Sequence, residues 1–183
     1  LEYVTNITDS FSAELSTVVG KSDVNLIDYD ENGTRLIRTT ETNLGDLCAD
    51  SFRVIMDADI GIINGGNIRK AIKVGDITLN DLLTVFPWGD MPCKLEVSGQ
   101  TILDMLEMGV LKYPKESGGF LHVSGLKYSI AANIPTSIET TDKGEFVRVA
   151  GERRVKNVQV LNKKTGVYEP IDAKKNYTLA GLE

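Results

Sequence analysis

The sequence has few of the residues on which hydrolytic and metal chemistry usually depend. Its 183 residues include one histidine, two cysteines and one tryptophan. A single histidine excludes histidine clusters with metal-ligand spacing, and neither Gly-x-Ser-x-Gly nor His-Glu-x-x-His occurs. We therefore predict no catalytic residue and no metal or cofactor site in this chain.

The scarce residues are predicted to be structural. Two cysteines are too few for a disulfide framework, and Cys48 recurs at helical spacing with Leu44 and Phe52, which predicts a small core side chain. His122 stands beside Leu121 and Val123 in a strand-like segment. A histidine in this setting is typical of a sheet residue whose ring is hydrogen-bonded.

Long apolar runs and basic runs are also missing. No window approaches 18 consecutive apolar residues, so no membrane span is predicted. The net charge is −6 and the 20 basic residues form no long run, which disfavours nucleic-acid binding. Any bound anion must be held locally by a few arginines. No apolar signal segment opens the chain. Because it begins without Met and ends abruptly at Leu182-Glu183, we interpret it as a piece of a longer protein.

The remaining composition, 42% hydrophobic and 25% charged, is typical of a globular protein with one core. Apolar spacing predicts helices over residues 5–19, 79–85 and 99–111, and another that starts at Thr42 or Asn43. Thr78 and Asp81 are spaced as the N-cap and acidic partner of the 79–85 helix. The apolar stripe of the helix after Thr42 consists of Leu44, Leu47, Cys48, Phe52, Ile55 and Met56.

Strands are predicted around residues 24–27, 60–63 and 94–97 and, by alternation of apolar side chains, throughout the last third of the chain. Asn162 to Gly166 has the composition of a hairpin turn. Helices dominate early and strands late. The pattern favours an α+β fold, a single domain over residues 1–183 with a mixed sheet flanked by helices.

Residues 64–69, Asn-Gly-Gly-Asn-Ile-Arg, follow a short apolar strand. Glycines 65 and 66 have no Cβ and would allow close backbone contact with a ligand, and Arg69 offers a planar donor fork to anions. The alternative is a turn that only reverses the chain. Arg35 and Arg38 could add further charge-assisted hydrogen bonds.

Trp88 follows a proline in a glycine-containing turn, where a large ring can stay exposed and stack on a nucleobase. The alternative is a ring that closes the end of the core.

Four segments in this order resemble the C-terminal domain of the 5'-nucleotidase and UDP-sugar hydrolase family. They are residues 38–47 (Arg-Thr-Thr-Glu-Thr-Asn-Leu-Gly-Asp-Leu), 64–69, 86–90 (Phe-Pro-Trp-Gly-Asp) and 118–125 (Gly-Gly-Phe-Leu-His-Val-Ser-Gly). The resemblance implies a domain that binds nucleotides or nucleosides and presents them to a separate N-terminal metallophosphoesterase domain, which holds two divalent metal ions. The chain alone is then inactive.

The resemblance also implies a set of substrate-binding residues. Arginines face the ribose and phosphate, a glycine loop faces the ligand, an aromatic ring forms half of a clamp around the base, and two further residues lie near the base. In this order, the matching residues are Arg35, Arg38 and Arg69; Asn64, Gly65 and Gly66; Trp88; Asp90 and Gly118.

Three departures from the family pattern stand out. Asn67 replaces a third glycine, Trp88 replaces the usual phenylalanine, and the chain ends before a second aromatic residue and a Gly-Gly-Asp-Gly loop. Two alternatives remain open: a non-catalytic surface module of the same fold, and a 2',3'-cyclic nucleotide phosphodiesterase. The resemblance further implies an extracellular, periplasmic or cell-wall location.

Overall fold

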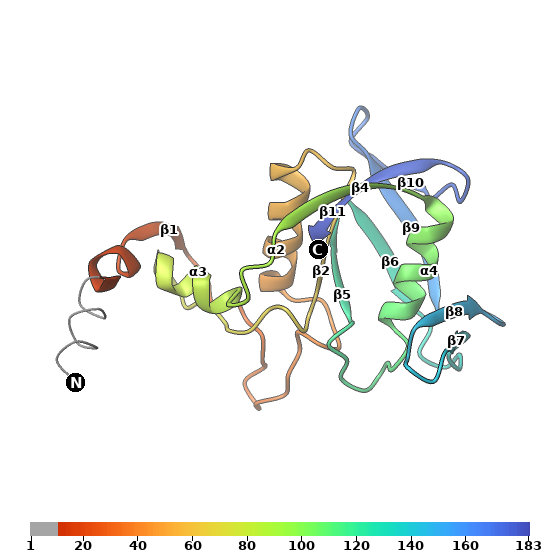
Figure 1. Cartoon of the computed structure of the whole chain (residues 1–183), viewed down its shortest axis with the longest axis horizontal. Coiled ribbons are helices and arrows are strands. Elements are labelled where there is room, and N and C mark those ends of the chain that lie inside the picture. Colours follow the sequence, from red (N-terminus) through yellow and green to blue (C-terminus); the bar gives the residue numbers. More distant parts are fainter. Residues whose placement is uncertain (1–10) are drawn as a thin grey trace.

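The computed structural model describes residues 11–183 (Figure 1). Strands outnumber helices and dominate the second half of the chain. The elements are β1 (Val18–Ser22), α2 (Asn43–Ile55), β2 (Ile60–Asn64), β3 (Gly75–Thr78), α3 (Leu79–Val85), β4 (Pro92–Ser98), α4 (Gly99–Gly109), β5 (Leu121–Ser124), β6 (Leu126–Ile130), β7 (Ile138–Thr140), β8 (Phe146–Val149), β9 (Val155–Asn162), β10 (Val167–Pro170) and β11 (Asn176–Leu182).

The centre of the molecule is a four-stranded sheet with the order β4-β11-β2-β5. The pair β11–β2 is parallel, whereas β11–β4 and β2–β5 are antiparallel, so the sheet is mixed as predicted. A second sheet, β10-β9-β6, and two two-stranded sheets, β1-β3 and β7-β8, complete the architecture. The predicted α+β class is confirmed, although the strands form several sheets rather than one.

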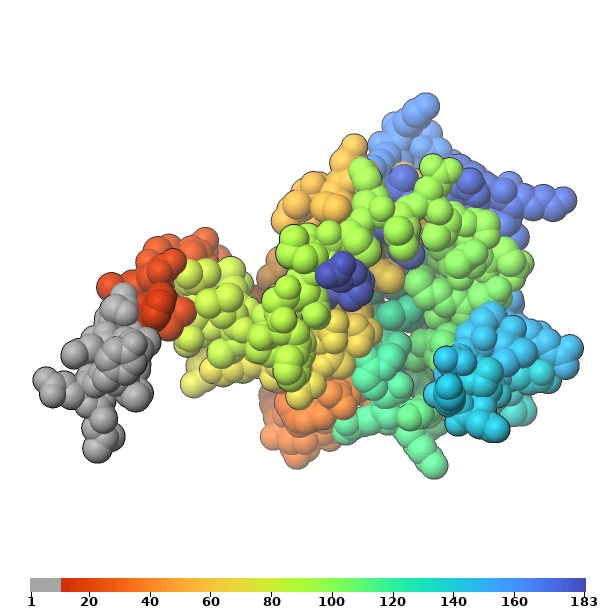
Figure 2. All heavy atoms as spheres, viewed as in Figure 1, coloured from red at the N-terminus to blue at the C-terminus, as the bar shows by residue number. Residues whose placement is uncertain are grey.

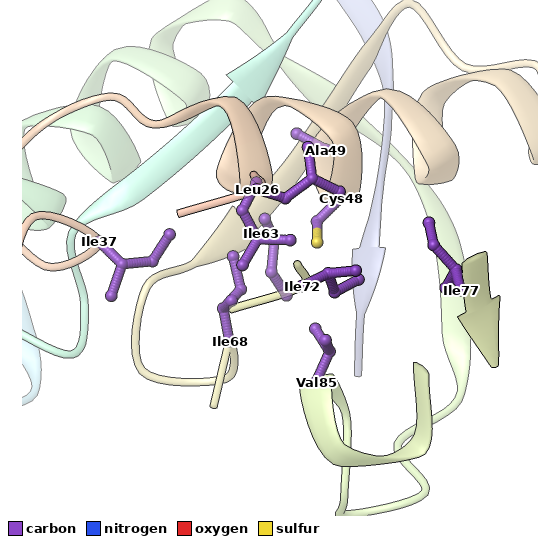
Figure 3. Close-up of a cluster of buried hydrophobic side chains, with 10 residues drawn as sticks. Leu26, Ile37, Cys48, Ala49, Ile63, Ile68, Ile72, Ile77 and Val85 are labelled. Atoms are coloured by element: carbon purple, nitrogen blue, oxygen red, sulfur yellow. The ribbon is translucent and has the colours of Figure 1, made fainter. Parts of the chain in front are cut away.

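Two hydrophobic clusters hold the layers together. The first lies between α2, the central sheet and the segments around residues 26, 37, 68 and 72, as Figure 3 shows. The second joins the central sheet to α4 and to the sheet of β6 and β9. In Figure 2, β1 and α3 form a lobe that projects from this body. No helix in residues 11–183 is long and apolar enough to cross a membrane.

Helix α2 begins where predicted, but its buried face is narrower than predicted. Thr42 caps it by accepting a hydrogen bond from the Gly45 amide at 3.1 Å. Leu44 and Cys48 are buried, whereas Leu47 and Ile55 are 48% and 77% exposed. The helix backbone lies close to the sheet, because a Cβ at Gly61 of β2 would be 2.1 Å from the Ala49 carbonyl oxygen, and the contacting face runs through Leu44, Cys48, Ala49 and the partly buried Phe52. The prediction is therefore wrong for Leu47 and Ile55.

Helices α3 and α4 lie close to where the local sequence patterns predicted them. Helix α3 has the predicted bounds, and Thr78 and Asp81 form a complete capping box. Helix α4 ends at Gly109, two residues before the predicted end. The buried Glu107 of α4 accepts hydrogen bonds from the amides of Arg154 and Val155 at 2.8 and 3.0 Å, which fixes α4 against the start of β9.

The N-terminal predictions succeeded least. The helix predicted over 5–19 lies partly outside the described residues; residues 11–15 are helical, but Val18 starts β1, which pairs with β3. Valine is β-branched, and the distant β3 supplies the partner that local spacing could not reveal. The strand predicted around 24–27 is reduced to one bridge between Leu26 and Ile72.

Candidate functional site

The loop after β2 is held in place by the chain around residue 118. The Gly65 amide donates to the Phe120 carbonyl at 2.8 Å, and the Gly66 amide donates to the Gly118 carbonyl at 2.9 Å. The Asn64 side-chain amide donates to the same Gly118 carbonyl at 2.9 Å. Two of the four matching segments, 64–69 and 118–125, thus form one backbone unit.

Residues 65 and 66 are glycines for a structural reason that the sequence alone did not indicate. A Cβ at Gly65 would lie 1.9 Å from the Ile37 carbonyl oxygen, and one at Gly66 would lie 2.9 Å from the Gly118 carbonyl oxygen. Neither glycine has a positive φ. Their lack of a side chain lets three backbone segments meet, whereas the predicted reason was close approach of a ligand.

The three predicted arginines come together. Arg35, Arg38 and Arg69 line one small pocket of about 50 Å³. Arg38 and Arg69 each follow a buried isoleucine of the first hydrophobic cluster, Ile37 or Ile68, by one residue. In Figure 3 both isoleucines belong to that cluster, so the core anchors the two segments that carry these arginines.

The arginines differ in their partners. Arg35 donates to the Tyr29 hydroxyl at 2.5 Å and lies 3.8 Å from Glu116, and the Tyr29 hydrogen bond raises the pKa of Arg35 above its ordinary value. The half-buried Arg38 guanidinium has no hydrogen-bond or ion-pair partner among residues 11–183. Arg38 is therefore the cation of the pocket whose donors are available to an anion.

Arg69 connects this pocket to Trp88. Its guanidinium donates to the Gly66 carbonyl at 2.9 Å, and its Cζ lies 5.9 Å from the centroid of the Trp88 ring. Trp88 is 64% exposed. The alternative of a core ring is thus wrong, and the residue offers a large aromatic face beside the arginine pocket.

Asp90 lies on the same side as Trp88. Both line a pocket of about 170 Å³ together with Phe52 and Phe86. The Asn67 side-chain amide donates to the Asp90 carboxylate at 3.5 Å, so Asn67 bridges the glycine loop to the 88–90 turn. One end of this bridge, Asn67, is a position at which the sequence departs from the family pattern.

Sequence reasoning missed Tyr29, which positions Arg35. The available signal was weak: Tyr29 and Arg35 lie on opposite sides of the Asp30–Gly33 turn and form an isolated bridge. The two residues therefore face each other across this turn.

His122 lies elsewhere. It is buried in β5, and its Nε2 lies 2.9 Å from the Ile37 carbonyl oxygen. The prediction of a hydrogen-bonded sheet residue is confirmed for this nitrogen, but Nδ1 has no partner. Cys48 is buried as predicted, and burial raises its pKa to about 12. Within the part of the chain that the structure describes, no group of three His, Cys, Asp or Glu side chains could hold a metal ion.

Comparison with known families decides what this arrangement belongs to. The family model of the 5'-nucleotidase C-terminal domain matches residues 18–182. The chain belongs to this family. The match covers all four segments from which the resemblance was inferred.

Relatives of this 5'-nucleotidase C-terminal domain agree in sequence and fold. The chain is 30% identical to a 5'-nucleotidase of Vibrio parahaemolyticus over 183 residues, and 37% identical to the trifunctional nucleotide phosphoesterase YfkN of Bacillus subtilis over 133 residues. These matches cover 100% and 68% of the chain but only 31% and 9% of the relatives.

Among solved structures, the chain is similar to a 5'-nucleotidase precursor of Thermus thermophilus, with a TM-score of 0.78 and 28% identity. The match covers 99% of this chain and 32% of that one. The Haemophilus influenzae NAD nucleotidase shares the fold, with a TM-score of 0.70 at 20% identity over 99% of this chain and 31% of that one. The domain thus spans about a third of each of these proteins.

Proposed function

We propose that this domain binds a nucleotide and presents it to a separate metallophosphoesterase domain of the same protein, which hydrolyses a phosphate ester with two divalent metal ions. The nucleotide phosphate or ribose contacts Arg38 and Arg69, with Arg35 as a third arginine, and the base stacks on Trp88. Asp90 and the 64–66 and 118 backbone unit flank the base. The relatives named as nucleotidases support this proposal, and each is longer than the chain.

One observation carries the proposal. An unpaired guanidinium, that of Arg38, lines a pocket with Arg69, and Arg69 also lies over an exposed tryptophan. A site for a phosphate ester of a nucleoside needs both features: donors for an anion and a flat apolar face for a base. Arginines and an exposed ring placed separately would not supply them to one ligand.

The chain's one tryptophan makes the test direct. Fluorescence of Trp88 is followed during titration with AMP and, separately, with adenosine. We expect both to change the signal, because the base stacks on the ring, and AMP to bind more tightly, because the arginines contact its phosphate. Loss of a charge-assisted hydrogen bond costs about 1.5–3 kcal/mol. Arg38→Ala should therefore weaken AMP binding about 10- to 150-fold and adenosine binding much less.

Two controls sharpen this test. Arg148→Ala removes an exposed arginine of β8 that pairs with Glu139, far from Trp88 in the sequence, and should leave both affinities unchanged. Arg38→Lys should rescue AMP binding poorly, because lysine lacks the planar fork. Equal affinities of AMP and adenosine, or unchanged AMP binding in Arg38→Ala, would contradict the assignment of the arginines.

The same titration separates the alternatives. A 2',3'-cyclic nucleotide phosphodiesterase is favoured if 2',3'-cyclic AMP binds more tightly than AMP. A non-catalytic surface module is favoured if the Trp88 fluorescence responds to neither AMP nor 2',3'-cyclic AMP. We also infer that the parent protein is exported to the cell envelope or beyond, a location testable by cell fractionation of the native host.

A further inference from the structure

A second cavity, of about 310 Å³, lies apart from the proposed nucleotide site. It contains none of the residues assigned above to nucleotide binding. One wall is the segment 39–41 with the first turn of α2, and the other is formed by β5 and β6. This volume is at the lower end of the range for small-molecule sites, about 300–1,000 Å³.

The strands that form the second wall are both sheet edges. Strand β5 is the last strand of the central sheet, and β6 is the last strand of the β10-β9-β6 sheet. The two strands diverge from Gly125, whose φ is +69°. The Phe120 carbonyl points toward β2, where it accepts a hydrogen bond from the Gly65 amide. Carbonyl groups along a strand of an antiparallel pair alternate in direction. The Val123 carbonyl, three residues later, therefore points away from β2 and toward the cavity side.

Two carboxylates on the opposite wall have no partner. Neither Glu41 nor Asp46 makes a side-chain hydrogen bond or ion pair with any residue in 11–183, although Asp46 is half-buried. Burial, followed by the charges of Glu41 and Asp50, raises the pKa of Asp46 to about 6. The cavity is therefore lined by two acidic side chains that make no ion pair in the described chain.

His122, in the β5 wall, has one ring nitrogen without a partner. Its side chain is 2% exposed, and Nδ1 is the buried side-chain atom without a hydrogen-bond partner in the described chain. Since Nε2 donates to the Ile37 carbonyl, Nδ1 carries a lone pair. It lies against Gly45, the residue before Asp46, because a Cβ at Gly45 would be 2.0 Å from it.

The charges around the cavity identify the ligand class. Lys127 lines the cavity, but its Nζ lies 4.3 Å from the Tyr168 ring centroid and makes no ion pair with the acids. The two carboxylates line the cavity without a partner in the described chain, whereas the Nδ1 of His122 is fully buried against Gly45. No three ligands converge for a metal ion in the described chain, and much of the remaining wall is apolar. Acceptors beside apolar side chains suit an alkylammonium group.

We propose that this cavity binds a small organic cation, with a primary ammonium group between Glu41 and Asp46 and its alkyl part against Phe120 and Leu126. The site differs from the nucleotide site in its residues and in the charge of its ligand. Binding supplies a counter-ion to two carboxylates that have no ion-pair partner in the described chain, of which Glu41 is exposed and Asp46 half-buried. The proposal does not depend on the domain's role in nucleotide hydrolysis.

The probe is n-butylammonium, and the readout is the NMR signal of the His122 imidazole, the one histidine of the sequence. The untagged 183-residue chain is titrated at pH 7.5 with n-butylammonium and with the neutral isostere n-butanol. We expect saturable binding of n-butylammonium with a Kd on the order of 1 mM, as is usual for so few atoms, and clearly weaker binding of n-butanol.

Substitutions and pH then test the assigned groups. Asp46→Asn should weaken n-butylammonium binding about tenfold through loss of a charge-assisted contact. Lowering the pH below 6 should do the same in the parent chain, because Asp46 gains a proton. Of the other titratable groups nearby, Glu41, Asp50 and Lys127 flank the site, while burial lowers the pKa of His122 and raises that of Tyr128 to about 12.

The matched control is Asp76→Asn, which removes an exposed acid of β3 outside the cavity and should leave binding unchanged. Three results would overturn the proposal: no shift of the His122 signal, equal binding of n-butanol, or unchanged binding in Asp46→Asn. A response to Mg²⁺ or Ca²⁺ without one to n-butylammonium would overturn the assignment of an organic cation.

Discussion

At the scale of single residues, two neighbouring groups oppose each other in their response to pH. Burial lowers the pKa of His122 below its ordinary value, so the unfolded chain binds its proton more readily and stability falls as the pH drops through 6.5. Asp46 behaves in the opposite way. Its folded pKa of about 6 exceeds the ordinary 3.8, so the folded chain binds the proton more readily and stability falls as the pH rises between these values.

The Asp46 effect gives a stability prediction. Asp46→Asn should stabilise the chain at pH 7.5 by about 1 kcal/mol, well below the full free energy of the shift, because solvent screens a partly exposed carboxylate. Its position in the first turn of α2 favours the charge by about 0.3–1 kcal/mol and offsets part of the gain. Urea unfolding of both chains at pH 7.5 and at pH 3.5 measures the change in the free energy of unfolding.

The gain should nearly vanish at pH 3.5, where Asp46 is protonated in the folded chain and mostly protonated in the unfolded chain. Asp76→Asn again serves as the control and should change stability little at either pH. A loss of stability in Asp46→Asn at pH 7.5 would show that the helix terminus outweighs desolvation, and that the charge has no cost that a ligand could relieve.

At the scale of elements, the loop after β2 depends on close backbone approach. The Gly65→Ala variant should lose about 3 kcal/mol of stability or more, because its Cβ would lie 1.9 Å from a carbonyl oxygen that belongs to the anchored 35–38 segment. Thermal unfolding measures the loss. Because Ile37 and the loop belong to one unit, the arginine pocket should be distorted in the same variant.

Gly20→Ala is the matched control for this prediction. Gly20 lies in β1, and the nearest atoms to an added Cβ are 4.0 Å away, so the change should be within about 0.5 kcal/mol. A Gly65→Ala variant as stable as Gly20→Ala would mean that the Ile37 carbonyl can move aside. The glycine would then be available for the ligand-facing role that the sequence first suggested.

The elements also show which parts of the fold could be predicted from sequence. The Thr78–Asp81 capping box and the Asn162–Gly166 turn involve residues a few positions apart, and both were located correctly. The β1–β3 pairing joins residues about sixty positions apart, and no local pattern specifies it. Leu47 belongs to the predicted apolar stripe of α2 but is exposed, because contact with the sheet selects a narrower face than spacing alone.

At the scale of the whole molecule, the candidate nucleotide site is assembled from segments far apart in the sequence. Arg38, Arg69 and Trp88 are brought together by the packing of Ile37 and Ile68 in one core and by the contact of Arg69 with the ring. Residue types and the family resemblance indicated these three residues. Their relative placement, and the cavity beside His122, follow only from tertiary packing.

The proposed nucleotide site yields a prediction for the isolated chain, because no group of three His, Cys, Asp or Glu side chains among residues 11–183 could hold a metal ion. Purified residues 1–183 should release no phosphate from AMP, with or without Mn²⁺, Zn²⁺ or Co²⁺. Hydrolysis by two metals needs a converging set of carboxylate and imidazole ligands, and the described residues 11–183 offer none. A colorimetric phosphate assay measures the rate, and the Trp88 titration on the same sample shows that the protein is folded and binds ligand.

Two variants identify the source of any phosphate that is released. The activity of a contaminating phosphatase does not change in Arg38→Ala, which should weaken AMP binding to this chain about 10- to 150-fold. It does not change in His122→Gln either, which removes the one histidine. Metal-dependent release that disappears in either variant would therefore belong to the chain itself and would contradict the division of labour proposed above. Release that is unchanged in both belongs to the contaminant, because binding of AMP to this domain depends on Arg38.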